Sequence, residues 1–267
     1  MITWVNGQPT QAISVADRGL AYGDGLFETL RVQQGWPLRL ELHLARLELG
    51  CQRLHIKLDF AQVRQEIQSF CAQAESAVCK LIVTRGVGQR GYAIPENARP
   101  QRILQLSSAP QWPAENSAQG VRLYACQTPL AIQPLLAGIK HLNRLEQVLA
   151  RAEWQEPSYA EGLMLDTEGN ITDCVFSNIF FVRDGRLLTP SLANCGVAGV
   201  MRAWIMQQAQ QLGIDCQETQ IKVTQLADMD EVFTSNSLYG IWPVVGYQNY
   251  RWSVGSITRR LQQRLMD

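Results

Sequence analysis

The stretch LLAGIKHLNRLEQVLAR, Leu135 to Arg151, places one lysine directly after a run of apolar residues. Lys140 follows Leu, Leu, Ala, Gly and Ile, and a segment typical of a helix, Asn143 to Arg151, comes next. Burial disfavours the charged form of lysine, so apolar surroundings are expected to lower the pKa of this amine. A neutral amine is the nucleophile that condenses with a carbonyl carbon. The ordinary alternative is a lysine whose stem packs on the core while its head reaches water.

The composition limits the classes of partner. The chain has 267 residues, with 24 basic and 24 acidic side chains, and no long block of like charge. This excludes the clustered basic field that a nucleic-acid partner or an anionic membrane surface requires. No apolar run approaches the roughly 18–20 residues that cross a bilayer. The length suits one large domain or two modest ones.

The cysteines and histidines indicate neither a disulfide framework nor a metal site. Seven cysteines have irregular spacing without a CxxC pair, and three histidines lie far apart. Reduced thiols in a cytoplasm are expected, and no metal. The N-terminal residues lack a basic region followed by an apolar one, so no secretory signal is expected.

The pattern before residue 109 predicts strands and helices in mixed order. VNGQ is an Asn-Gly hairpin signal. GDGLFETLRVQQG predicts a strand with Phe27, Thr29 and Arg31 on one face. A helix follows, because apolar residues recur at helical spacing, and a second helix is expected at about 60–77. VCKLIVTRG and RILQLSSAP read as strands. The apolar stripe of the first helix is Leu40, Leu44, Leu47, Cys51 and Leu54.

The second half predicts further hairpins and helices. The segment 109–120 lacks periodicity and is the best linker candidate. Strands are expected in VRLYACQ and DEVFTSN, hairpins in GLMLDTEGNITDCVFSNIFFV and VRDGRLLTP, and helices at about 197–212 and 254–265. This mixture predicts an α+β fold in two domains, residues 1–114 and 115–267.

Several short sequence motifs occur together in the order typical of one enzyme family. They are DRGLAYGDGLFETLRV, HLARL, TRGVGQRGY, GIKHLNRLEQV, EGNITDCVFSNIF, GVAGVMR and NSLYGIWPV. From about Asn6 to Val245 the chain resembles the fold-type IV pyridoxal-phosphate enzymes, and within them it is most similar to the aminodeoxychorismate lyases. The resemblance implies a smaller N-terminal α/β domain, a larger C-terminal cofactor-binding domain with a β-barrel-like core, and pyridoxal 5'-phosphate as cofactor.

The resemblance assigns roles to two basic residues. Lys140 matches the lysine that binds pyridoxal phosphate covalently and later moves the proton at the reacting carbon. Arg46, in HLARL, matches the arginine that holds the cofactor phosphate, which a guanidinium fork can bond twice. Judged from its residue type alone, Arg46 is an ordinary solvated helix arginine, because it lies off the apolar stripe.

The resemblance assigns the other phosphate contacts to two further motifs. GVAGVMR begins a predicted helix, so the backbone N–H groups of Val200 and Met201 would face the phosphate. Ser237, in TSNSLYG, matches a further phosphate contact, and Asn236 matches a position near the ring. By themselves these residues read as a Gly-rich helix start and a turn-forming serine.

One position departs from the family pattern. Members usually carry Glu where this chain has Asp173, and that carboxylate pairs with the pyridine nitrogen. A protonated nitrogen lets the ring accept electrons. Aspartate has the charge but one methylene less reach, and an Asp that caps the local hairpin is the alternative. Asn178 matches an asparagine near the ring hydroxyl.

Three residues bear on the reaction. In the lyases of this family a threonine at the Thr29 position assists the departing group, whereas branched-chain aminotransferases carry glycine there. Arg90 and Tyr92, in GQRGY, would bind a substrate carboxylate. By residue type alone, Thr29 is a strand former and Arg90 an exposed loop arginine. The resemblance implies a lyase that converts 4-amino-4-deoxychorismate to 4-aminobenzoate and pyruvate for folate synthesis.

Two other functions stay open. A D-amino-acid or branched-chain aminotransferase would use the same fold and cofactor. A non-catalytic protein that kept the fold would have lost Lys140 or the phosphate site, and both are present. Family members pair as two-fold dimers, so a homodimer that binds a small-molecule substrate is expected.

Overall fold

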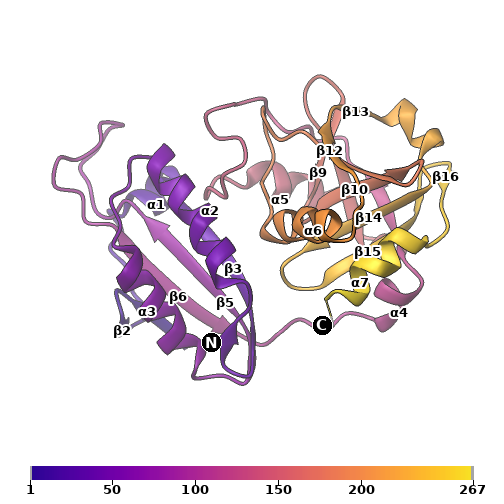
Figure 1. Cartoon of the computed structure of the whole chain (residues 1–267). Coiled ribbons are helices and arrows are strands. Elements are labelled where there is room, and N and C mark those ends of the chain that lie inside the picture. Colours follow the sequence, from indigo (N-terminus) through magenta and orange to yellow (C-terminus); the bar gives the residue numbers. More distant parts are fainter. Residues whose placement is uncertain (1, 266–267) are drawn as a thin grey trace. The chain divides into compact units, whose positions relative to one another are not determined.

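The chain forms two compact units in the computed structural model, which describes residues 2–265 (Figure 1). The first unit contains the residues up to Gln111 together with Ile139–Asn143. The second contains Trp112–Gly138 and the residues from Arg144 onward. The sequence predicts one boundary, between residues 114 and 115. The division differs in one respect, because the later segment Ile139–Asn143, which includes Lys140, belongs to the first unit.

The first unit is built on an antiparallel sheet of six strands in the order β2-β1-β6-β5-β3-β4, with helices α2 and α3 packed on it. The Asn-Gly signal is confirmed, since Asn6 and Gly7 have φ angles of 52° and 77° and join β1 to β2. The elements are β1 (Ile2–Val5), β2 (Gln8–Pro9), α1 (Arg18–Tyr22), β3 (Gly25–Gln33), β4 (Trp36–Pro37), α2 (Leu40–Arg53), α3 (Phe60–Cys71), β5 (Ser76–Thr84) and β6 (Gln101–Ser107).

Helix α2 buries four of the five predicted stripe residues on the side that contacts β3, and the fifth, Leu54, is the half-buried C-cap. Its buried residues include Leu40, Leu44, Leu47 and Cys51. Strand β3 alternates as expected, because Glu28, Leu30 and Val32 are buried whereas Phe27 and Thr29 are half-buried and Arg31 is exposed. The second face of β3 therefore carries side chains that are available to a ligand.

The predicted end of the second helix is wrong. Helix α3 ends at Cys71 rather than near residue 77, and β5 begins at Ser76. Strand β5 pairs with β3 along its whole length, from Ser76 opposite Gln33 to Thr84 opposite Gly25. Sheet pairing here overrides a local sequence that favours helix.

The second unit is a ten-stranded sheet in the order β12-β11-β10-β14-β15-β7-β8-β9-β13, with β16 paired to β15. Strand β9 also contacts β10 and β11, which lie far from it in this order, so the sheet curls into a barrel-like form. Its strands are β7 (Val121–Ala125), β8 (Glu161–Leu165), β9 (Asn170–Cys174), β10 (Asn178–Arg183), β11 (Arg186–Pro190), β12 (Cys216–Thr219), β13 (Ile221–Lys222), β14 (Glu231–Asn236), β15 (Gly240–Tyr247) and β16 (Tyr250–Arg251).

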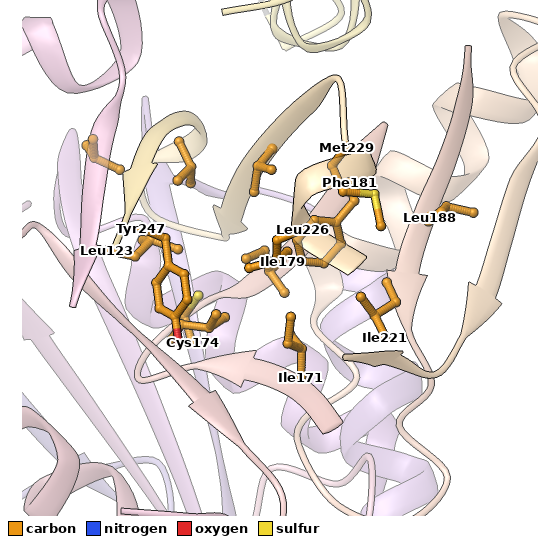
Figure 2. Packing of buried hydrophobic residues seen from close by; sticks show 14 of the residues in the cluster. Leu123, Ile171, Cys174, Ile179, Phe181, Leu188, Ile221, Leu226, Met229 and Tyr247 are labelled. Carbon is orange, nitrogen blue, oxygen red and sulfur yellow. The ribbon is translucent and has the colours of Figure 1, made fainter. Parts of the chain in front are cut away.

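Two apolar cores lie on the two sides of this curled sheet. Ile179 and Phe181 of β10 point into the inner core, which Figure 2 shows. Phe180 packs in the outer core, where its ring stacks on Phe233 with a 5.0 Å centroid distance. Because both faces of β10 are buried, its sequence is a continuous apolar run rather than an alternating one.

Up to residue 265, the second unit has four α-helices, two of which pack in the outer core. Helices α6 (Val200–Gln211) and α7 (Ser256–Gln263) supply residues to the outer core. Helix α5 (Leu145–Ala152) follows the lysine segment. The expected linker at 109–120 is partly helical, because α4 (Ala114–Ala118) begins directly after Pro113. Proline at this boundary suits a helix start.

The predicted α+β class is confirmed, with helices and mainly antiparallel strands in both units. None of the helices formed by residues 2–265 has the length and apolar character that a membrane crossing needs.

Candidate functional site

Lys140 belongs to a short extended segment whose backbone is held at both ends. In the second unit, Gly138 pairs with the Gly196–Ala198 segment: its N–H donates to the Gly196 carbonyl at 2.9 Å, and its carbonyl accepts from Ala198 at 3.0 Å. In the first unit, the Lys140 carbonyl accepts from the Phe27 amide at 2.9 Å, and His141 bridges to Leu26. Lys140 therefore adds to an edge of β3.

The lysine amine lies against an aromatic ring. Its Nζ is 4.4 Å from the centroid of Phe27, and the side chain is half-buried. The Nζ of Lys80 lies over the same ring at 5.4 Å. Lys80 is also the register partner of Thr29. The alternation predicted that Phe27 and Thr29 share one face of β3, and the structure adds the Lys140 amine, which lies over the Phe27 ring.

Arg46 is fixed by a buried carboxylate that the sequence reasoning did not identify. Its Nε donates to Oε1 of Glu28 at 2.9 Å, and its Nη2 donates to Oε2. The same Oε2 meets Nδ1 of His43 at 2.5 Å. A signal for Glu28 existed, because it is the one acidic residue on the otherwise apolar face of β3.

The charges of this cluster are set by burial and pairing. Burial alone raises the pKa of Glu28, but the Arg46 charge and the His43 hydrogen bond outweigh it and lower the pKa to about 2. Burial lowers the pKa of His43, and the nearby Glu28 offsets this only in part. At neutral pH Glu28 is therefore an anion that orients the Arg46 guanidinium.

In the second unit, Asp173 is buried with both carboxylate oxygens bonded. Its Oδ1 accepts from Nδ2 of Asn178 at 2.6 Å, and its Oδ2 accepts from the Val197 amide at 2.7 Å. Nδ2 of Asn178 also donates to the Val197 carbonyl at 2.8 Å. The aspartate thus reaches beyond its own hairpin, unlike a residue that only caps a local turn.

Glycines let this segment approach the carboxylate. A Cβ on Gly196 would lie 2.9 Å from Oδ2 of Asp173, and one on Gly199 would lie 1.9 Å from Oδ1 of Asn178. Gly199 is the N-cap of α6 and has no side chain of its own to cap that helix. The first backbone N–H groups of a helix lack intrahelical acceptors. Val200 and Met201, both buried, thus begin a helix whose N-terminus suits an anion, three residues later than the expected start at 197.

The turn after β14 contains the next expected residues. Oδ1 of Asn236 accepts from the amides of Leu238 and Tyr239 at 2.9 and 3.0 Å, so this side chain shapes the turn. Ser237 is half-buried in the same turn. The neighbouring Ser235, which sequence reasoning missed, has a buried Oγ without a hydrogen-bond partner among residues 2–265. It is in register with Asn178 on β10.

The loop that carries Arg90 and Tyr92 is anchored by its backbone. Nη1 of Arg18 donates to the Gly91 carbonyl at 2.9 Å, and the Gly91 amide donates to the Tyr22 hydroxyl at 3.1 Å. The side chains of Arg90 and Tyr92 are exposed. The structure therefore holds the loop in place while it leaves these two side chains accessible.

The expected site residues fall in two groups, one in each unit. The first unit contains Lys140, Thr29, Arg46, Arg90 and Tyr92. The second unit brings Asp173 and Asn178 into direct contact and holds Val200, Met201, Asn236 and Ser237 at the start of α6 and the end of β14.

Replacing Glu28 with glutamine tests the cluster around Arg46. Glu28→Gln leaves Arg46 without its buried counter-charge, so the free energy of unfolding at pH 6 is expected to fall by about 3 kcal/mol. The pKa of Glu28 in the folded protein, about 2, lies below its ordinary value of 4.5. Between pH 6 and pH 3 the free energy of unfolding of the parent should therefore fall by about 2 kcal/mol relative to that of the variant, because Glu28 becomes protonated more readily in the unfolded chain.

Chemical unfolding of parent and variant at both pH values measures this difference. Glu48→Gln, at an exposed position of the same helix, is the control. A Glu28→Gln deficit that is equally large at pH 3 and pH 6 would contradict the assignment of a low pKa to Glu28.

Comparisons with known proteins give a consistent result. Residues 25–247 match the family described as "Amino-transferase class IV". The chain is 37% identical over 267 residues to an aminodeoxychorismate lyase of Vibrio harveyi, with 98% of each chain covered. The crystal structure of 4-amino-4-deoxychorismate lyase from Pseudomonas aeruginosa shows 56% identity and a TM-score of 0.98, and covers 100% of this chain and 98% of that chain. A D-alanine aminotransferase of Listeria monocytogenes is 27% identical over 263 residues, 96% of this chain and 90% of that one. The chain therefore belongs to the class IV aminotransferase family.

Proposed function

We propose that this chain is a pyridoxal-phosphate-dependent lyase that converts 4-amino-4-deoxychorismate to 4-aminobenzoate, a folate precursor, and pyruvate. The observation that carries the proposal is the half-buried Lys140 amine, 4.4 Å from the Phe27 centroid on the face of β3 that presents Thr29. The 37% identical relative and the 56% identical structure both carry the name of this lyase.

The residues of the chain fit the cofactor. Asp173 is a buried carboxylate of the kind that pairs with a protonated pyridine nitrogen. The start of α6, whose N-cap is a glycine, offers backbone N–H groups to a phosphate. The buried Ser235 hydroxyl, in register with Asn178, has no hydrogen-bond partner among residues 2–265 and can bond a ligand. These groups match a protonated pyridine ring that carries a phosphate.

We assign the holding of the cofactor to the residues that the family resemblance singled out. Lys140 would bind it covalently, and Arg46, oriented by Glu28, would hold the phosphate with Val200, Met201 and Ser237. Gly138, only two positions before Lys140, pairs with the same Gly196–Ala198 segment that contacts Asp173. The chain thus connects the lysine directly to the segment beside the proposed nitrogen partner.

Asp173 acts as that nitrogen partner in spite of its short side chain. Val197 and Asn178 fix both oxygens, at 2.7 and 2.6 Å, so the carboxylate keeps one orientation. Asn178 would contact the cofactor next to it, and Asn236 would shape the neighbouring turn. When bound, the cofactor supplies an electron sink for the electron pair left at the substrate carbon.

The remaining residues direct the elimination. The Lys140 amine takes the proton from the ring carbon that bears the substrate amino group. The Thr29 hydroxyl assists the departure of the enolpyruvyl oxygen, and Arg90 with Tyr92 binds a substrate carboxylate. Loss of the ether produces an aromatic ring, so the elimination is strongly downhill. The exposure of Arg90 and Tyr92 suits side chains that meet a ligand from solvent.

A second copy of the chain is the proposed partner. Leu145, Val148 and Leu149, at helical spacing on α5, are 76%, 61% and 59% exposed, and Leu135 is 73% exposed. Such an apolar patch within the second unit marks an interaction surface, and a symmetric homodimer is the commonest solution.

All seven cysteines are free thiols, which supports a reducing compartment such as the cytoplasm.

Replacing Lys140 tests the proposed reaction. Lys140→Ala should lower 4-aminobenzoate release from 4-amino-4-deoxychorismate by at least about 1,000-fold, because the covalent anchor and the proton carrier are lost together. Lys57→Ala, at an exposed position, should keep the parental rate. Product is measured by chromatography.

The same preparations distinguish the rival activity. Incubation with D-alanine and 2-oxoglutarate should produce no comparable D-glutamate. Fast D-glutamate formation by the parent without 4-aminobenzoate release would replace the lyase by an aminotransferase.

Charged residues on α5 test the partner. The double change Val148→Asp and Leu149→Asp should convert a particle of twice 30.0 kDa into a monomer in sedimentation velocity, because charges in an apolar interface cost several kcal/mol. Trp36→Asp, at an exposed site of the first unit, is the control. A parent that sediments as a monomer, or a double variant that stays dimeric, would remove α5 from the interface.

A further inference from the structure

A fully buried acid lies beside the turn that joins β9 to β10. Glu161, the first residue of β8, has no exposed surface. Its Oε2 accepts from the Ser177 hydroxyl at 2.7 Å and from the Phe176 amide at 3.4 Å, and its Oε1 accepts from the Gly162 amide at 2.9 Å. The Gly162 carbonyl accepts from the Val175 amide at 3.0 Å. Glu161 and Gly162 thus bind three consecutive residues of the turn.

This turn connects Asp173, the proposed partner of the cofactor nitrogen, to Asn178, the proposed contact near the ring hydroxyl. The Cys174 amide donates to the Ser177 carbonyl at 2.8 Å and closes the turn. Asp173 comes immediately before it and Asn178 immediately after it, 2.6 Å apart between side-chain atoms. A shift of the turn would therefore alter their separation directly. The Phe176 carbonyl also accepts from Nδ2 of Asn236 at 3.4 Å.

Glu161 binds the turn without a counter-charge. Burial raises its pKa to about 8, although the hydrogen bonds from Gly162, Ser177, Phe176 and Val175 oppose this rise. No basic residue among 2–265 forms an ion pair with it. The side chain is therefore uncharged at neutral pH, and its contribution to the turn is that of a hydrogen-bond acceptor. An amide keeps one of the two acceptor oxygens.

A second buried acid of the same unit shows what a purely structural role looks like. Glu231 accepts from the amides of Ile257 and Thr258 at 3.1 and 2.8 Å, and so caps α7. It contacts neither Asp173 nor the β9–β10 turn. Glu231 is thus a matched control for the loss of a buried glutamate.

We propose that Glu161 is a positioning residue for the cofactor site: by holding the Cys174–Ser177 turn through hydrogen bonds, it sets the geometry of Asp173, the proposed partner of the pyridine nitrogen, and of Asn178 bonded to it. The inference rests on the proposed function for the identity of the cofactor. It does not depend on which reaction the cofactor serves.

The test measures pyridoxal-phosphate affinity and absorbance, which need no turnover. Glu161→Leu removes the acceptors and should raise the Kd of the apoprotein for pyridoxal phosphate by about 10-fold or more, a coupling that neighbouring residues commonly show. It should also shift the visible absorbance band of the bound cofactor. Glu161→Gln keeps an acceptor oxygen and should recover most of the affinity and the parental band. Glu231→Gln should lower stability and change neither.

A double-mutant cycle tests whether the effect acts through Asp173. In an Asp173→Asn background, Glu161→Leu should change the Kd less than about 2-fold, because the positioned group is already impaired. Equal Kd changes in both backgrounds, or a Glu161→Gln variant as impaired as the leucine variant, would overturn the proposal. If Glu161→Leu does not fold, the comparison of Glu161→Gln with Glu231→Gln decides. A parent that binds the cofactor but releases no 4-aminobenzoate would refute the lyase assignment and leave this inference standing.

Discussion

The hydrogen bond from the Phe27 amide to the Lys140 carbonyl, at 2.9 Å, is the constraint on which the proposed chemistry depends. It makes Lys140 part of the β3 edge, although the lysine is far from β3 in sequence. The amine then lies over the Phe27 ring at 4.4 Å rather than in open solvent. Contact with an aromatic face and partial burial are what separate this lysine from an ordinary surface lysine.

The second unit holds the short side chain of Asp173 in one position. Asp173 is buried, and hydrogen bonds from Val197 and Asn178 occupy both of its oxygens. Glycine at 196 and 199 makes room for this approach, because a Cβ at either position would meet Asp173 or Asn178. Because both oxygens are fixed, the shorter aspartate can hold its carboxylate in one position, where family members usually carry glutamate.

Local patterns were sufficient to predict the frame but not its long-range contacts. The Leu40–Cys51 stripe and the alternation of β3 were predicted because each depends on one periodicity within one element. The pairing of Glu28 with Arg46 joins a strand to a helix, and no spacing rule reports it. Likewise α3 ends at Cys71 because β5 pairs with β3, a tertiary effect. The roles of Lys140 and Asp173 came from the resemblance, since their residue types alone favoured ordinary explanations.

Reduction of the protein with sodium borohydride in the presence of pyridoxal phosphate, followed by peptide mass mapping, tests the central assignment most directly. We expect one modified peptide, which contains Lys140. Lys80 is the informative alternative, because its amine lies over the same ring at 5.4 Å. A modification on Lys80 or elsewhere, or no modification at all, would contradict the assignment of Lys140 as the residue that carries the cofactor.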